Sequence, residues 1–282
     1  MKNSISIRGK LMDLSIPKIM GIINITPDSF YDKSRVMDKN SILTKIEQMI
    51  SEGVDIIDLG AMSSRPGANI IEEEVELNRL IPIVKCITTN FPTTILSIDT
   101  IRARVAQQAI DNGAHIINDI SAGNFDNNML ITVGKLNVPY ICMHSKGLPI
   151  EMQLNPNYEN VLVEITDFFI KKIGVCQTLG IKDIIIDPGF GFGKSIAHNY
   201  TLLKHLNTFQ FLNHPILVGL SRKSMIYKAL NIPIEETLPA TTALNLMALQ
   251  NGAKILRVHD VKAAKQAINL YQLFIQTPAS IY

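Results

Sequence analysis

Eight short apolar segments, rich in β-branched residues, recur along the chain. They occupy residues 18–24, 55–59, 94–99, 115–120, 138–143, 183–188, 215–220 and 254–259. Each is apolar along nearly its whole length, which is typical of strands that are buried on both faces of a parallel sheet. Between them lie segments with helical spacing, clearest at residues 41–53, 101–113, 159–180 and 261–276. The chain therefore predicts strands that alternate with helices.

This alternation predicts an α/β fold, and its count favours a closed TIM-type (β/α)₈ barrel. No Pro- or Ser-rich linker divides the 282 residues, so we expect a single domain over residues 1–282. An open doubly wound sheet is the alternative, because it is built from the same units. Hydrophobic residues make up 46% of the chain, enough for a large core.

Charge and cysteine usage narrow the classes of partner. The net charge is only +2 and no basic run stands out, which argues against nucleic acid or a membrane surface as the main partner. No apolar stretch is long enough to cross a bilayer, and the N-terminal segment lacks the apolar region of a signal peptide. Cys86, Cys142 and Cys176 form no C-x-x-C pair, so we expect free thiols in a reducing compartment. These features predict a cytoplasmic protein that acts on or binds a small molecule.

Every apolar segment is followed by polar or reactive residues. A lone Asp or Asn in such a place is more often a helix cap. Eight such ends together predict one site, because the active sites of (β/α)₈ barrels lie at the carboxyl ends of the strands. The residues concerned are Asn24, Asp58, Asp99, Asn118, Met143, His144, Asp187, Ser221, Arg222, Lys223, Arg257 and His259.

The residue types at these ends favour electrostatic recognition of a ring and an anion. No H-E-x-x-H motif or His/Cys cluster indicates zinc, and no G-x-S-x-G motif indicates a serine nucleophile. Asp99 and Asp187 can accept hydrogen bonds from an N–H-rich heterocycle such as a 2-amino-4-oxo-pyrimidine. Asn118 can donate and accept, and Lys223 can donate to a ring oxygen or nitrogen. A multiply charged anion would suit Arg65, Arg257 and His259.

The stretch DIIIDPGFGFGKS, residues 183–195, ends in Gly-Lys-Ser but does not fit a phosphate-binding P-loop. The P-loop has four residues between its first glycine and the Gly-Lys-Ser. That first position is Pro188, which has no backbone N–H to offer a phosphate. We interpret the stretch as a buried strand that delivers Asp187 to the site, followed by glycines that let the backbone approach a ligand. We expect Lys194 to be a solvated residue after these glycines.

Seven segments, taken in order, resemble the dihydropteroate synthase family: IMGIINITPDSFYDKS, DLGAMSSRPGA, SIDT, NDISAG, DPGFGFGKS, LSRKSM and RVHD. The resemblance covers about residues 18–261. It implies a transferase that joins 6-hydroxymethyl-7,8-dihydropterin pyrophosphate to p-aminobenzoate, releasing pyrophosphate, in folate synthesis. It also implies a Mg²⁺ requirement, sulfonamides as inhibitors and a homodimer.

The resemblance assigns roles to residues that match the family's motifs. The pterin would be held by Asp99, Asn118, Asp187 and Lys223, with Met143 packed on the ring. Asn24 would bind the Mg²⁺ that the pyrophosphate carries, and the phosphates would be bound by Ser64, Arg65, Arg257 and His259. The p-aminobenzoate pocket would be formed by Phe30, Pro66, Phe192 and Ser224. Asp99, Asp187 and Lys223 would be the catalytic residues, and no general base is assigned.

The chain departs from the family pattern at three places, and two alternatives stay open. Met62 stands where the family often has glutamate, Lys33-Ser34 where it often has two glycines, and Ser145-Lys146 where Met-Gln is usual. One alternative is a methyltetrahydrofolate methyltransferase, which shares the pterin ligands but has no use for the pyrophosphate loops. The other is a pterin-binding paralogue without turnover.

Overall fold

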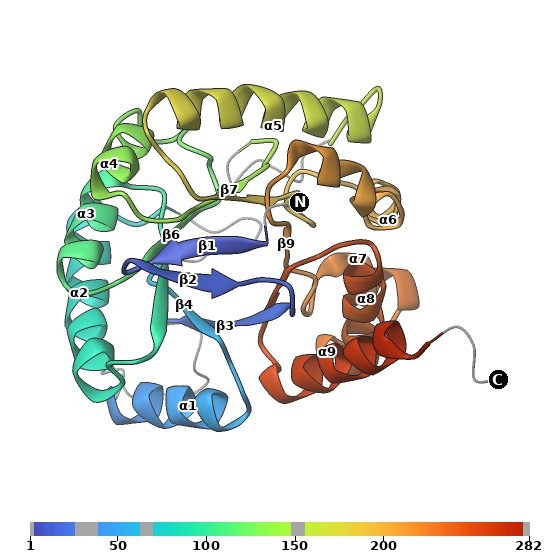
Figure 1. The fold of residues 1–282 in the computed structure, drawn as a ribbon, viewed down its shortest axis with the longest axis horizontal. Coiled ribbons are helices and arrows are strands. Elements are labelled where there is room, and N and C mark those ends of the chain that lie inside the picture. Colours follow the sequence, from blue (N-terminus) through green and yellow to red (C-terminus); the bar gives the residue numbers. More distant parts are fainter. Residues whose placement is uncertain (1–2, 26–38, 63–69, 148–155, 279–282) are drawn as a thin grey trace.

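In the computed structural model, which describes residues 3–25, 39–62, 70–147 and 156–278, the eight predicted segments form one parallel sheet. Its strands are β3 (Lys18–Asn24), β4 (Ile56–Gly60), β5 (Ile95–Asp99), β6 (Ile116–Asp119), β7 (Tyr140–Met143), β8 (Ile184–Asp187), β9 (Leu217–Val218) and β10 (Ile255–Val258). They lie in the order β8-β7-β6-β5-β4-β3-β10-β9. A parallel bridge between Ile186 and Ile216 joins β8 to β9. This bridge closes the sheet, so the (β/α)₈ barrel is confirmed and the open doubly wound alternative is wrong (Figure 1).

Helices surround the strands as an outer ring (Figure 1). They are α1 (Lys39–Ser51), α2 (Glu73–Asn90), α3 (Ala103–Asp111), α4 (Met129–Leu136), α5 (Val161–Thr178), α6 (Ile196–Lys204), α7 (Ser224–Leu230), α8 (Leu238–Gln250) and α9 (Val261–Gln276), with 3₁₀ turns η2 (Leu206–Leu212) and η3 (Ile234–Glu236). Both α7 and α8 lie between β9 and β10. Within the described ranges, none of these helices has the length and apolarity needed to span a bilayer.

Local sequence signals explain where several helices begin and end. Asn160 caps α5, because its side-chain oxygen accepts hydrogen bonds from the N–H groups of Leu162 and Val163. The helix α3 ends at Asp111 with Asn112 as its C-cap, and Gly113 follows with φ 100°, a left-handed conformation that glycine adopts without strain. These short-range signals agree with the ends predicted from the sequence.

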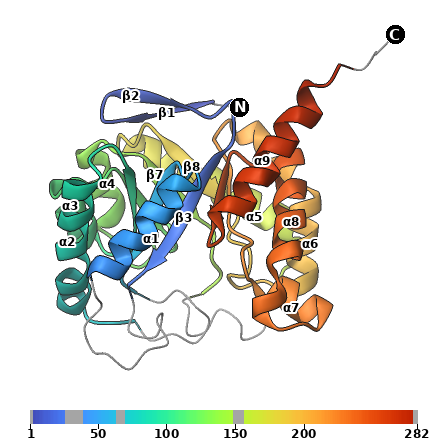
Figure 2. The same ribbon diagram turned by 90° about the horizontal axis from the view of Figure 1, so that it is seen from below.

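A hairpin that the sequence did not predict closes one end of the barrel. It consists of β1 (Ser4–Ile7) and β2 (Lys10–Asp13), paired antiparallel. It lies across the end of the barrel at which β3 begins (Figures 1 and 2). Ile5, Ile7 and Leu14 are buried in one cluster with inward-facing residues of the barrel strands. Those barrel residues are Met20, Ile56, Ile116, Ile141, Ile185, Leu217 and Ile255.

The same inward faces become polar toward the opposite end of the barrel. Because side chains alternate along a strand, the residue two positions after an inward-facing one also points inward. Asn118 thus follows Ile116, and Asp187 follows Ile185. The hairpin end of the interior is therefore apolar, and the other end holds the polar residues predicted to form a site.

We predict that truncation of Ile5 destabilises the protein without changing its chemistry. Ile5 has no exposed surface, so Ile5→Ala removes buried methylene groups and should lower the free energy of unfolding by about 2–4 kcal/mol. Leu11→Ala, on the same hairpin but 75% exposed, should change it by less than about 0.5 kcal/mol. Urea denaturation measures both. Similar losses in the two variants would show that the hairpin does not plug the barrel.

Candidate active site

The register of the parallel strands brings three predicted ligands to one level of the barrel. Asp99 pairs with Asn118 on the neighbouring strand. On its other side, Gly60 pairs with both Asp99 and Asn24. A Cβ atom at Gly60 would lie 3.3 Å from Cβ of Asp99 and 3.5 Å from Oδ1 of Asn24. The missing side chain therefore leaves the amide of Asn24 and the carboxylate of Asp99 facing each other across β4.

One guanidinium group holds two buried carboxylates at the centre of this level. Nε of Arg257 donates to Oδ2 of Asp58 at 2.6 Å, and its Nη2 donates to Oδ2 of Asp99 at 2.7 Å. The side-chain amide of Asn118 also donates to Oδ2 of Asp58, at 3.0 Å. The other oxygen of Asp58, Oδ1, is buried without a hydrogen-bond partner among the described residues. Asp58, which the sequence placed among the strand-end residues without a specific role, thus holds Arg257 and Asn118 in the site.

The charge of this cluster is not balanced by its own residues. Two carboxylates share the single positive charge of Arg257. Burial raises the pKa of Asp99 to about 7, against the opposing effect of Arg257, and the nearby Asp58 raises it further. A ligand that offered N–H donors would stabilise the ionised form of Asp99 and lower this pKa again.

A second carboxylate–amine pair lies at the ends of β8 and β9. Oδ1 of Asp187 accepts a hydrogen bond from the N–H of Gly189 at 2.7 Å, and burial raises the pKa of Asp187, against the opposing effect of Lys223. Burial lowers the pKa of Lys223 to about 8, against the effect of Asp187. The ammonium of Lys223 donates to the carbonyl of Phe190 and lies 4.8 Å from the ring centre of Phe192. The two groups can therefore present an acceptor and a donor to one ligand.

An apolar cluster lies beside these charged groups. Met143 and Phe192 are buried together with Met62, Ile101 and Ile120. Met62 is only 4% exposed, so the residue that departs from the family pattern is packed into this cluster. A flat ring bound by the carboxylates would have an apolar surface of Met143 and Phe192 close by.

His259, which the sequence predicted as a ligand of an anion, is not a cation in this structure. Nδ1 of His259 lies 3.0 Å from the hydroxyl of Ser221. Burial lowers the pKa of His259 to about 3, and Arg222 and Arg257 lower it further, so its imidazole is neutral near pH 7. Arg222 forms an ion pair with Asp260 at 2.7 Å. Ser224 is the first residue of α7.

Four predicted site residues lie outside the described residues, namely Phe30, Ser64, Arg65 and Pro66, as do Lys33 and Ser34. The structure places the others at the carboxyl ends of the strands or in the segments that follow them.

Two expectations for residues 183–195 need correction. Lys194 is not solvated: it is 3% exposed, and its ammonium donates to the carbonyls of Gly189 and Phe192. At two positions the glycines make room for a neighbouring loop of the protein. A Cβ atom at Gly189 would lie 1.9 Å from the carbonyl oxygen of His144, and one at Gly193 would lie 2.5 Å from that of Lys146. A lysine directly after a glycine carries no local signal of burial, so sequence reasoning missed its place.

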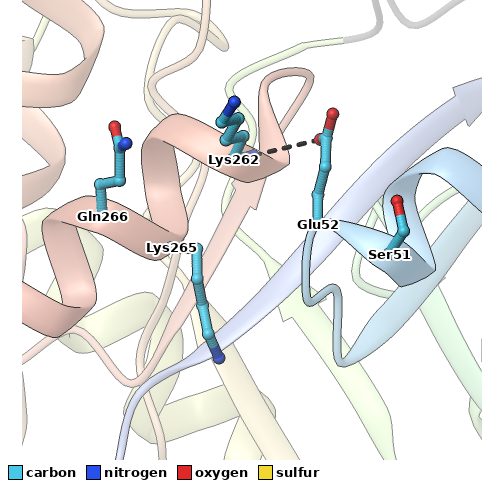
Figure 3. A pocket seen from close by; sticks show the side chains of 5 residues that line it. All are labelled: Ser51, Glu52, Lys262, Lys265 and Gln266. Carbon is cyan, nitrogen blue, oxygen red and sulfur yellow. Dashed lines mark hydrogen bonds between the residues drawn. The ribbon is translucent and has the colours of Figure 1, made fainter.

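A surface hollow between α1 and α9 is separate from this site. It has a volume of about 520 Å³ and is lined by Ser51, Glu52, Lys262, Lys265 and Gln266 (Figure 3). Glu52 accepts a hydrogen bond from the backbone N–H of Lys262 at 3.2 Å. No strand-end residue lines this hollow, and we assign it no role.

Comparison with known proteins identifies the family. The profile of the family described as pterin binding enzyme matches residues 20–259. The dihydropteroate synthase of Haemophilus influenzae is 44% identical over 265 residues, which cover 93% of this chain and 96% of that protein. The crystal structure of the Yersinia pestis dihydropteroate synthase with a sulfonamide drug complex superposes with a TM-score of 0.92 at 38% identity, covering 97% of this chain and 100% of that one.

The chain belongs to the dihydropteroate synthase family. The enzyme from Xanthomonas albilineans, solved with 4-aminobenzoic acid, also matches, with a TM-score of 0.91 at 35% identity over 99% of this chain and 100% of that one. The resemblance seen in the sequence is thereby confirmed. The methyltetrahydrofolate methyltransferase alternative is set aside, because these relatives are synthases.

The raised pKa of Asp99 predicts a pH dependence of stability in the ligand-free enzyme. Its pKa is raised from 3.8 to about 7, so the folded protein binds a proton more tightly than the unfolded chain does. This contribution to stability is fully present below about pH 4 and is lost as the pH rises toward 7. The melting temperature of wild type relative to Asp99→Asn should therefore fall by several degrees between pH 4.5 and 7.5. A difference that stays constant across this range would contradict the raised pKa.

Proposed function

We propose that the strand-end cluster is where this dihydropteroate synthase joins 6-hydroxymethyl-7,8-dihydropterin pyrophosphate to p-aminobenzoate. The products are 7,8-dihydropteroate and pyrophosphate. One observation carries the proposal: buried acceptors on Asp58, Asp99 and Asp187 share one barrel mouth, where Asp58 and Asp99 have only the single charge of Arg257 between them. Buried carboxylates are costly unless they are paired, and an N–H-rich pterin ring supplies the missing donors.

The pterin is held by groups with complementary hydrogen-bonding capacity. Asp99 and Asp187 accept from the ring N–H and amino groups, and Asn118 supplies both a donor and an acceptor. Lys223 donates to a ring oxygen or nitrogen. Met143 packs against the ring, supported by its burial beside Phe192.

The pyrophosphate is held by Arg257 and His259 at the barrel mouth. The family resemblance adds Ser64 and Arg65, which lie outside the described residues, as further phosphate ligands. His259 is neutral near pH 7, so it donates a single hydrogen bond and adds no positive charge, whereas a nearby phosphate would raise its pKa and favour the doubly donating cation. Arg257 also forms ion pairs with Asp58 and Asp99, so the pyrophosphate shares the positive charge of Arg257 with these two carboxylates.

The described residues contain no cluster of three His, Cys, Asp or Glu side chains that would form a self-contained metal site. They do fit a Mg²⁺ ion that arrives with the pyrophosphate. Such an ion keeps several waters and takes few protein ligands besides phosphate oxygens. The amide oxygen of Asn24, beside Asp99, is a suitable ligand. Bound Mg²⁺ would offset the negative charge that develops on the leaving pyrophosphate.

The reaction follows as a displacement with dissociative character. The C–O bond to pyrophosphate breaks as the phosphate ligands stabilise the leaving charge. Ionised Asp99 and Asp187 stabilise the positive charge that develops on the pterin. The amine of p-aminobenzoate, held by Phe30, Pro66, Phe192 and Ser224, forms the new C–N bond and then loses its proton to solvent. Positioning the weakly nucleophilic amine is the remaining task of the site.

Direct product analysis tests this function. The purified protein, supplied with the dihydropterin pyrophosphate, p-aminobenzoate and Mg²⁺, should form 7,8-dihydropteroate and an equal amount of pyrophosphate. Its gene should restore growth of a folate auxotroph that lacks this activity. Binding of pterin without product would instead support the paralogue without turnover.

Three broader features remain part of the proposal. We propose that residues 1–282 form one domain and that two copies form a homodimer. Exposed apolar side chains on α9, Leu270, Leu273 and Phe274, support an interface, and sedimentation would measure the dimer. A cytoplasmic location is supported by the free thiols of Cys86, Cys142 and Cys176.

Replacement of Asp187 should impair catalysis while the fold survives. Asp187→Asn keeps the shape but turns one acceptor oxygen into a donor, which would face a donor on the ring. The loss should be about 2–4 kcal/mol of transition-state stabilisation, or roughly 30- to 1000-fold in kcat/KM. Asp183→Asn is the matched control, because Asp183 directly precedes the same strand and accepts from the N–H of Ser6 at the hairpin end. Asp183→Asn should stay within about threefold of wild type. Equal effects of the two changes would remove Asp187 from the site.

Pyrophosphate and p-aminobenzoate should bind with positive coupling. If both ligands order the same residues, the ligand that binds first bears the cost of ordering them. Mg²⁺-pyrophosphate should then make the binding free energy of p-aminobenzoate more favourable by about 1–3 kcal/mol. Calorimetry with and without Mg²⁺, and with and without pyrophosphate, measures this. Affinity that is unchanged by Mg²⁺-pyrophosphate would mean that the nucleophile pocket is already formed.

A further inference from the structure

Lys194 is a buried cation whose ammonium is surrounded by backbone carbonyl groups. Its Nζ donates to the carbonyl oxygens of Gly189 at 2.9 Å, Phe192 at 3.0 Å and His144 at 3.3 Å. It also lies 3.0 Å from Nδ1 of His144. Its side chain is 3% exposed, and none of the hydrogen bonds recorded for it in the described residues involves a carboxylate.

These partners belong to the segments that follow two neighbouring strands. The carbonyls of Gly189 and Phe192 follow β8, which carries Asp187, and His144 directly follows Met143 of β7. Met143 and Asp187 are register partners, and the N–H of His144 donates to the carbonyl of Asp187 at 2.9 Å. Lys194 thus connects the residues directly after the two strand ends that carry proposed pterin ligands.

The rest of the local structure is arranged around this connection. Glycine at position 189 lets the backbone approach the carbonyl of His144 so closely that a Cβ atom would lie 1.9 Å from it. The hydroxyl of Tyr158 donates to the carbonyl of Gly193 at 2.9 Å. The ring of His144 is held edge-on by Phe168 of α5, with ring centres 4.8 Å apart.

Burial lowers the pKa of Lys194, and the acceptors around its Nζ favour the protonated form against this effect. Burial lowers the pKa of His144 to about 2, and Lys194 lowers it further, so the imidazole stays neutral. A neutral imidazole with its proton on Nε2 accepts at Nδ1 from the ammonium of Lys194. Three N–H donors then meet Nδ1 of His144 and the two nearer carbonyls.

We propose that Lys194 is a positioning residue that sets the geometry of the pterin ligands Met143 and Asp187 by joining the segments after β7 and β8. Burying a cation is costly, and a loop needed only for connectivity has no reason to bear that cost. Lys194 acts through Asp187, whose Oδ1 is held by the N–H of Gly189, the residue whose carbonyl Lys194 binds. This role rests on the proposed function of the site, but its structural part is independent of turnover.

The test compares Lys194→Met with Ser195→Ala. Methionine keeps the length and apolar stem of the lysine and removes its donors. Ser195→Ala removes the side chain that caps α6 by accepting from the N–H of His198 at 3.1 Å, so it destabilises the same segment without touching the ammonium site. Binding of 6-hydroxymethylpterin and of Mg²⁺-pyrophosphate is measured on both variants, together with the KM and kcat for each substrate.

We expect Lys194→Met to weaken pterin binding at least tenfold and to raise the KM for the pterin substrate, while pyrophosphate binding stays within twofold. Ser195→Ala should lower the melting temperature and leave both affinities within twofold. Pterin affinity within twofold of wild type in Lys194→Met would overturn the proposal. So would a parallel loss of pterin and pyrophosphate binding in Lys194→Met.

Two further measurements keep the outcome decisive. Lys194→Gln, which retains a shorter donor, replaces Lys194→Met if that variant does not fold, and it should show a smaller loss of pterin affinity in the same direction. Amide hydrogen exchange of His144 and Gly189 should rise at least tenfold in the variant that folds, and unchanged exchange would overturn the structural part. If wild type neither binds pterin nor turns over, the proposed function fails, and the exchange result alone decides the role of Lys194.

Discussion

The strict alternation of side chains inside a closed barrel is the constraint on which the rest of the structure depends. Each strand contributes every second residue to the same narrow interior, so one set of positions must fill the core and the next must serve the ligand. Ile116 and Asn118, or Ile255 and Arg257, show this division within a single strand. The hairpin makes it possible, because Ile5 and Leu14 complete the apolar end of the interior. The polar end is then free to hold groups that would be too costly in an ordinary core.

Unbalanced charge and an unpaired hydrogen-bond acceptor are what make this polar end of the barrel a binding site. Arg257 donates to both Asp58 and Asp99, but its single charge does not balance two carboxylates. Oδ1 of Asp58 has no hydrogen-bond partner in the described part of the chain. Lys223 and Asp187 form a second, looser pair in which each shifts the pKa of the other against the effect of burial. A donor-rich heterocycle would supply the missing hydrogen bonds at both places. The affinity for a pterin would thus come from hydrogen bonds and charge interactions that these side chains do not complete within the folded protein.

The sequence was sufficient to predict the barrel and the strand ends that carry the proposed ligand-binding residues. Apolar β-branched segments followed by Asp99, Asn118 and Asp187 are local signals, and each strand formed where such a signal stood. The pairing of Arg257 with Asp58 was beyond reach, because it joins residues 199 positions apart through closure of the sheet. The hairpin was missed because Ser4–Ile7 and Lys10–Asp13 mix polar and apolar residues and so lack the continuous apolar run that marked the barrel strands. Lys194 was misread for the same reason as the pairing of Arg257 with Asp58, because its burial depends on contacts with a loop that follows another strand.

Closure also determines when this protein can become native. The strand β3 (Lys18–Asn24) is synthesised before the other barrel strands, yet one of its two edges pairs only with β10 (Ile255–Val258). During translation that edge presents unpaired backbone groups next to the apolar side chains of Ile19 and Ile23. Contacts between such distant parts of a chain form slowly, because a long loop must close first. The nascent barrel is therefore most exposed to aggregation just before its last strand leaves the ribosome, when a chaperone that covers β3 would help it most.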